Sequence, residues 1–157
     1  MKVGRYLEHP RNWGLAWLVL CLSFAANILD NVINDFLGYY NATVLTLYGH
    51  FSWFPRIDLS FREWLLGVIL ADAVLLLLTP LAYRNSLLLR PLAYGFSTIM
   101  LLNGLGIILA SLLGQTVPSV HFTGSAPGFY SSPLLVAASA HLLWRLRSSH
   151  KTNGRAT

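Results

Sequence analysis

Charged residues are scarce in this sequence. Only 11% of its 157 residues are Asp, Glu, Lys or Arg, whereas 55% are hydrophobic and 13% are aromatic. A soluble domain carries about 25% charged residues, so this chain has too few polar groups to cover a surface that faces water. The composition predicts an all-α integral membrane protein, and the length allows one compact domain.

Several functional motifs are also missing. Cys21 is the single cysteine, so an intrachain disulfide and a cysteine metal cluster are both excluded. The sequence has no HExxH motif, no Gly-rich phosphate loop and no nucleophile elbow. The formal net charge is +5, but the basic residues stand at the ends of apolar runs and form no basic and aromatic stretch. We therefore expect no metal, no cofactor and no nucleic-acid partner.

What the sequence does contain is long apolar runs. A helix needs about 20 apolar residues to cross about 30 Å of hydrocarbon. Four segments meet this length: 14–33, 61–83, 91–114 and 127–146. We expect a bundle of four transmembrane helices over 14–147, with a cytoplasmic segment 1–13 before it and a flexible tail 148–157 after it.

The basic residues predict how the bundle is oriented. Nine of the eleven lie on one side of it: Lys2, Arg5, Arg11, Arg84, Arg90, Arg145, Arg147, Lys151 and Arg155. Only Arg56 and Arg62 lie opposite. Since cytoplasmic loops carry an excess of Lys and Arg, both termini are expected in the cytoplasm. The membrane would be the endoplasmic reticulum in a eukaryote and the inner membrane in a bacterium.

The outer segment 34–60 is rich in aromatic residues. They include Tyr39, Tyr40, Tyr48, Trp53 and Phe54. Aromatic side chains with polar tips favour the headgroup zone, so this segment is expected to be an interfacial loop or short helix over one mouth of the bundle. A re-entrant fifth span is the alternative. Asn41-Ala42-Thr43 has the pattern of a glycosylation acceptor on this side.

A polar stripe runs along the end of the first predicted span. Its members are Asn27, Asp30, Asn31, Asn34 and Asp35. Offsets of three, four, seven and eight place them on one helix face. The stripe could descend into the bundle as a functional surface, or it could be a solvated helix end.

Asp72 lies near the middle of the second predicted span, with no basic residue within two turns of that helix. A carboxyl group in such a place favours its neutral form and can donate a proton to a substrate or a hydrogen bond to a ligand. The alternative is a neutral Asp72 bonded to Asn103 across a helix interface.

Other polar residues are weaker candidates. Glu63 and Arg62 open the second span, where a solvated salt bridge is the ordinary arrangement. His50 and His121 stand on outer segments and could fold over the cavity mouth, whereas His141 is expected to be structural. The candidates for contact with a substrate are Asn27, Asn31, Asn34, Glu63, Asn103, His121 and Tyr130.

The order of these features resembles the EXPERA family, which includes emopamil-binding sterol isomerases and the sigma-2 receptor. The resemblance covers about 12–147. It rests on the Asp30 stripe, Tyr48, Trp53, Trp64, Asp72, Pro80, Arg90-Pro91, Tyr130-Ser131-Ser132-Pro133-Leu134-Leu135, Arg145 and Arg147. A weaker similarity is to small bacterial membrane proteins with a His-x-x-Glu-Glu motif, of which 31–35 would be a degenerate version, followed by Pro127-Gly128.

The EXPERA resemblance implies four or more spans around a cavity open to lipid, which takes sterols or cationic amphiphiles. It also implies that Asp30 and Asp72 are paired acids lining that cavity. The chain departs from the family at Asp72, where Glu is usual, and at Leu76, where Gln is usual. The isomerase histidine has no clear counterpart in the second span.

The leading hypothesis is a membrane-embedded isomerase or cyclase that acts on a sterol or isoprenoid. Asp72 would protonate an alkene, and Asp30 would stabilise the cation or accept the departing proton. The competing hypotheses are a non-catalytic protein that binds or carries a sterol or other lipid, and a structural subunit of a membrane complex. The expected partners are a lipophilic small molecule and membrane lipid, and the sequence also allows a homodimer.

Overall fold

The computed structural model describes residues 13–51 and 53–153, and it is mostly helical. The expected segment 1–13 lies outside the described residues except for Trp13, as do residues 154–157. The elements in chain order are α1 (Gly14–Ile33), α2 (Phe36–His50), α3 (Phe61–Leu77), α4 (Thr79–Tyr83), α5 (Arg90–Leu113), β1 (Gln115–Val117), β2 (Val120–His121) and α6 (Ser132–Asn153).

Three stretches of the described chain are long and apolar enough to cross a membrane: Gly14–Ile33, Phe61–Tyr83 and Arg90–Leu113. The second consists of α3 and α4. α6 has 22 residues, about 33 Å at 1.5 Å per residue, but Arg145 and Arg147 in its second half lower its hydropathy.

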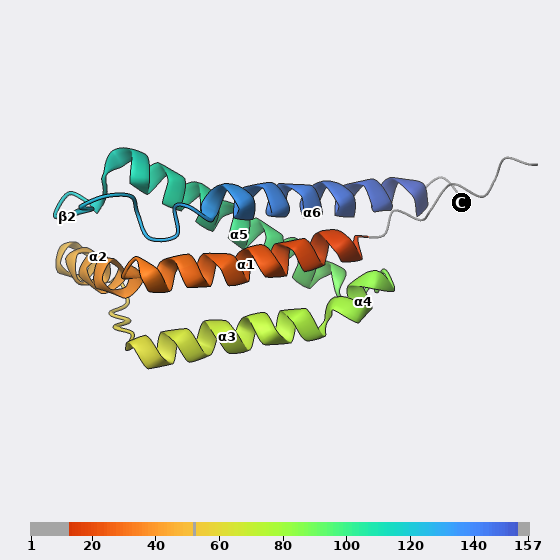
Figure 1. Ribbon diagram of the computed structural model, residues 1–157, viewed down its shortest axis with the longest axis horizontal. Helices are drawn as coiled ribbons and strands as arrows, with labels where there is room; N and C mark the ends of the chain where they lie inside the picture. Colours follow the sequence, from red (N-terminus) through yellow and green to blue (C-terminus); the bar gives the residue numbers. More distant parts are fainter. Residues whose placement is uncertain (1–12, 52, 154–157) are drawn as a thin grey trace, which may run out of the picture.

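The long helices lie side by side and alternate in direction along the chain (Figure 1). α6 packs against α5 and α1, whereas α3 contacts α1 and little else. α2 and the hairpin of β1 and β2 lie at one end, which we call the open end (Figure 1). The opposite end contains the start of α1 together with α4, and we call it the closed end.

The closed end has a tightly packed apolar core. Trp13 and Trp17 are fully buried, and their rings lie 6.2 Å apart, edge to face. Trp17 also lies 5.7 Å from Phe96 of α5. A Cβ atom on Gly14 would come within 2.7 Å of the Tyr83 backbone, so only glycine lets α1 and α4 approach so closely.

The bounds of α3 have local causes. Ser60 and Glu63 form a capping box at its start: Ser60 Oγ accepts from Glu63 N (3.3 Å), and Glu63 Oε2 accepts from Ser60 N (3.1 Å). The helix ends before Pro80, which has no N–H to continue it. In that last turn, Trp17 Nε1 donates to Leu75 O over 3.1 Å, so an indole from α1 supplies a partner for a terminal carbonyl.

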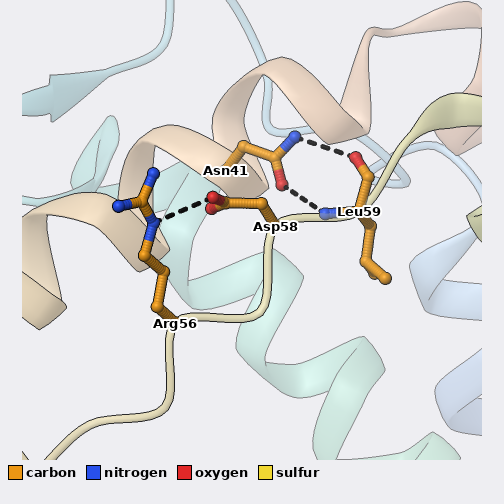
Figure 2. Close-up of polar contacts among 4 residues, drawn as sticks. All are labelled: Asn41, Arg56, Asp58 and Leu59. Carbon is orange, nitrogen blue, oxygen red and sulfur yellow. Dashed lines mark hydrogen bonds and ion pairs between the residues drawn. The ribbon is translucent and has the colours of Figure 1, made fainter.

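The aromatic outer segment forms a helix, α2, followed by an extended return to α3. Asn41 holds this return in place: its Nδ2 donates to Leu59 O over 3.1 Å, and its Oδ1 accepts from Leu59 N over 3.3 Å (Figure 2). A glycan on Asn41 Nδ2 would break this double contact. The expected acceptor sequence is thus a structural clamp.

The segment after α5, between the third and fourth predicted spans, contains a β-hairpin. Gly114 has a φ of 68° and ends the helix, and its carbonyl then accepts from Phe122 N over 2.9 Å. Between these residues the chain forms the antiparallel hairpin, a small exception to the all-α prediction.

The helix in the region of the fourth predicted span, α6, begins five residues later than predicted, because the chain around Gly128 forms turns before Ser132. α6 then continues through Asn153. The first part of the tail expected to be flexible is therefore helical.

Candidate functional site

The polar stripe of α1 faces the beginning of α6. Asp30 Oδ2 accepts hydrogen bonds from Ser131 N (2.8 Å) and Ser131 Oγ (2.9 Å). Asn27 Nδ2 donates to Ser131 Oγ over 2.9 Å and to Gly128 O over 3.4 Å. Because Ser131 directly precedes α6, the Asp30 carboxylate lies at a helix N-terminus, where free N–H groups and the helix dipole stabilise a negative charge.

The other asparagines of the stripe complete this network. Asn31 Nδ2 donates to Asn27 Oδ1 over 3.0 Å, and Asn34 Nδ2 donates to Asp30 Oδ1 over 2.7 Å. Gly128 has a φ of 81°, and a Cβ there would come within 2.8 Å of Asn31 Oδ1. Asn27 and Asp30 therefore join α1 to the start of α6. Asn31 and Asn34 bond to Asn27 and Asp30 within α1, and the buried Asn31 Oδ1 has no hydrogen-bond partner within the described residues.

Asp35 does not join the network. It is exposed, adopts a left-handed φ of 51° and precedes α2. The helix that carries the stripe ends at Ile33, so the helical spacing used to place Asp35 on the same face no longer applies. The expected five-residue stripe is thus a four-residue network.

Asp72 is buried where α3 meets α1, with 7% of its surface exposed. Its Oδ1 atom is buried and has no hydrogen-bond partner within the described residues. It lies close enough to Cys21 of α1 for its charge to act on the thiol. The helix contact therefore encloses a carboxyl group without satisfying it.

The two candidate acids are not neighbours. Asp30 lies three residues before the end of α1, and Asp72 lies eleven residues after the start of α3 at the same end of the bundle (Figure 1). Asp72 is therefore about 12 Å deeper along the helix axes. The alternative bond from Asp72 to Asn103 is also missing from the described part of the chain: Asn103 is exposed on α5. The structure thus separates Asp72 from Asp30, its partner in the EXPERA resemblance, and from Asn103, its partner in the alternative interpretation.

A pocket of about 270 Å³ lies at the open end between α2, α5 and the hairpin. We call it the α2–α5 pocket. Its lining residues are Phe36, Tyr39, Tyr40, Thr43, Asn103, Gly106, Ile107, Ala110, Thr116, Phe122, Ala126 and Pro127. On both helices the lining positions recur at offsets of three, four and seven, which is the spacing of one helix face. Neither Asp30 nor Asp72 lines it.

The walls of the α2–α5 pocket are mainly aromatic and aliphatic. The Tyr39 and Phe122 rings lie 4.9 Å apart, and the Phe36 and Tyr40 rings stack at 5.6 Å. At the hairpin, Thr43 Oγ1 lies 2.6 Å from Thr116 Oγ1, so these hydroxyls bond to each other. Among the described residues, no carboxylate, imidazole, amine or thiol lines the pocket.

Of the residues expected to contact a substrate, Asn103 alone lines this pocket. Glu63 caps α3, so the expected pairing with Arg62 is replaced by bonds to Ser60. His121 is exposed on β2, and Tyr130 is 74% exposed beside Phe129.

His50 and His141 are exposed as well. His50 Nδ1 lies 2.9 Å from Thr46 O, one turn earlier in α2. His141 Nε2 accepts from Arg145 Nε over 3.4 Å, one turn along α6. Neither lines the α2–α5 pocket, and within the part of the chain that the structure describes no three His, Cys, Asp or Glu side chains could together hold a metal ion.

Most of the pocket lining was not predicted from the sequence. Tyr39 and Tyr40 were predicted to lie in the headgroup zone. The offsets of three, four and seven residues also place them on one helix face with Phe36 and Thr43, and that face lines the pocket. The matching face of α5 contains Gly106 and Ala110, whose small side chains leave the space. A search for paired faces of this kind could have found the site.

Comparison with known proteins adds no relative: no family model, no curated protein and no solved structure matches this chain. The EXPERA resemblance therefore stays a prediction from the sequence.

Proposed function

We propose that this protein is a four-span membrane protein that binds a lipophilic small molecule in the α2–α5 pocket and releases it unchanged. The observation that carries this proposal is the lining of the pocket. Its aromatic and aliphatic walls suit an apolar ligand. The described lining residues include no carboxylate, imidazole, amine or thiol, so catalysis in the pocket would depend on Tyr and Thr hydroxyls, which are weak acids and weak nucleophiles near neutral pH.

Three apolar helices and the position of α6 support the four-span arrangement. α6 has the length of a span and packs along α1 and α5. Arg84, Arg90, Arg145 and Arg147 stand toward the closed end, so we place that end in the cytoplasm. The α2–α5 pocket then opens near the outer leaflet.

Single cysteines can test this orientation, because Cys21 is the sole native cysteine. In a Cys21→Ala background, Ser125→Cys should react with a membrane-impermeant maleimide on intact cells, and Arg84→Cys should react only after the cells are opened. Labelling of both on intact cells, or the reverse pattern, would contradict the orientation.

The pocket itself can be tested with two glycines of α5. Gly106 lines the pocket and Gly95 does not, and an added Cβ meets no atom within 4 Å at either position. Gly106→Phe should fill the pocket, and Gly95→Phe is its matched control. Native mass spectrometry of the purified protein should find a bound small molecule in the unaltered chain and in Gly95→Phe, and about tenfold less in Gly106→Phe. Equal occupancy in the two variants, or none in the unaltered chain, would contradict the proposal.

An isomerase or cyclase is the second candidate, and the unpartnered Asp72 carboxyl favours it. Such an enzyme would need Asp72 to reach a substrate from the contact of α1 and α3. Membranes containing the unaltered chain or Asp72→Asn can be incubated with candidate isoprenoids. Loss of turnover in the variant would favour the enzyme, and equal turnover would remove Asp72 from the mechanism.

A further inference from the structure

Asn103 is a polar group of the α2–α5 pocket whose side chain is unpaired within the described residues. It is the fourteenth of the 24 residues of α5, so it lies near the middle of an apolar span. Its side chain lines the pocket, is exposed, and makes no hydrogen bond within the described residues. An amide at this depth has little access to water.

The other polar groups of the pocket are differently placed. The Thr43 hydroxyl is bonded to both Tyr39 O (2.7 Å) and Thr116 Oγ1 (2.6 Å). Tyr39 and Tyr40 belong to α2, at the end of the bundle, where a phenol hydroxyl can reach the headgroup zone. Asn103 is therefore the group that most needs a partner from a ligand, because an unpaired amide in an apolar medium is unfavourable.

The volume limits what that ligand can be. A volume of about 270 Å³ lies at the small end of the range for small-molecule sites, which is about 300–1,000 Å³. The pocket therefore suits a short chain or a one-ring molecule better than the four fused rings of a sterol. The lack of a carboxylate in the lining also removes the usual partner of a cationic amphiphile.

We propose that the ligand is a neutral amphiphile with one hydroxyl or carbonyl head and a small apolar body, such as a short chain or a single ring. The head enters first and pairs with the Asn103 amide, while the body lies between Tyr39, Tyr40 and the small residues of α5. This assignment rests on the proposed function, since it names the ligand class of the same pocket.

The test uses two photoreactive probes, a ten-carbon aliphatic alcohol that carries a diazirine and the matching hydrocarbon without the hydroxyl. The full chain in lipid nanodiscs is irradiated with each probe, and labelled peptides are mapped by mass spectrometry. The alcohol should label the peptides of α2 and α5 that line the pocket. Asn103→Leu should lower this labelling at least about fivefold, the effect of one lost hydrogen bond, and Asn103→Ser should lower it less.

A merely structural role for Asn103 makes a different prediction. If Asn103 bonds to a second copy of the chain, Asn103→Leu should destabilise the ligand-free protein or change its oligomeric state, and either result would overturn the inference. If the ligand head is its partner, Asn103→Leu leaves the oligomeric state unchanged and makes the ligand-free protein at least as stable.

The probes also separate failure of the ligand class from failure of the pocket. Equal pocket labelling by the alcohol and the hydrocarbon would reject the head-group assignment and leave binding in the pocket intact. Labelling that Gly106→Phe does not block would reject the pocket itself, and with it both proposals.

Discussion

Glycine residues have opposite roles at the two ends of the bundle. At the closed end, Gly14 has no free space, because a Cβ would meet the Tyr83 backbone at 2.7 Å. At the open end, Gly106 faces the α2–α5 pocket, and a Cβ there would meet nothing within 4 Å. Glycine permits a close helix contact at the closed end and leaves a cavity at the open end.

This difference suggests that stability and binding are located in different parts of the molecule. The closed end buries the rings of Trp13 and Trp17 against α4, α5 and α6. The open end contains exposed aromatic residues, a hairpin joined to α2 by hydroxyl contacts, and the pocket. Substitutions at the closed end should thus unfold the protein, whereas those in the pocket should change binding alone.

The largest loss of stability is expected from Trp17→Ala. The side chain is fully buried, contacts Trp13 and Phe96, and donates to Leu75 O. Its loss should lower the free energy of unfolding by about 3–5 kcal/mol, measured by SDS titration in mixed micelles. Trp53→Ala is the control, since Trp53 is 78% exposed at the other end and should change stability little. Similar losses in both variants would refute the distinction between the ends.

The next largest loss of stability is expected from Asp30→Asn, which tests whether the polar stripe is structural. Asp30→Asn leaves one acceptor oxygen where the carboxylate serves both Ser131 and Asn34. The free energy of unfolding should fall by about 2 kcal/mol, the usual range for a hydrogen bond to a charged group. Asp35→Asn is the matched control, because Asp35 is exposed and asparagine tolerates its left-handed backbone. An unchanged stability in Asp30→Asn, with binding lost, would make Asp30 a ligand-binding residue instead.

A gain in stability is expected from Asp72→Leu. The buried Oδ1 atom of Asp72 has no partner within the described residues, and leucine has the same number and branching of side-chain heavy atoms. Removing an unsatisfied polar group should raise the free energy of unfolding by about 1–2 kcal/mol, and ligand binding in the α2–α5 pocket should not change. Weaker binding in this variant would instead couple Asp72 to the pocket, and a loss of stability would mean that the carboxyl has a partner in the membrane.

Much of the fold followed from composition. Long apolar runs located α1 and α5 within one residue at each end, because so long an apolar stretch is typical of a membrane-spanning helix. The capping box of Ser60 and Glu63 was also readable as a local pattern. What the sequence could not show is which helix faces which, because packing between helices depends on contacts far apart in the chain.

The candidate site shows this limit most clearly. The spacing of Asn27, Asp30 and Asn31 correctly predicted one face, but the partner of that face, Ser131, is about 100 residues away and carries no unusual chemistry. Polar residues in a span were expected to mark a cavity. Here they join two helices, while the pocket has a lining in which Asn103 is the single predicted contact.

The smallest changes in the free energy of unfolding are expected from two polar contacts of the extended return at the open end. Asn41→Ala removes both bonds to Leu59 and should lower stability by about 1 kcal/mol. Arg56→Ala removes an exposed ion pair with Asp58, 2.9 Å long, and should lower it by at most about 0.5 kcal/mol. Only the Arg56 contact should weaken further in high salt, because screening acts on exposed charges and not on an amide bonded to the backbone. Unfolding measured at low and high salt would therefore separate them, and a salt-dependent loss in Asn41→Ala would show that the clamp is not made by its amide.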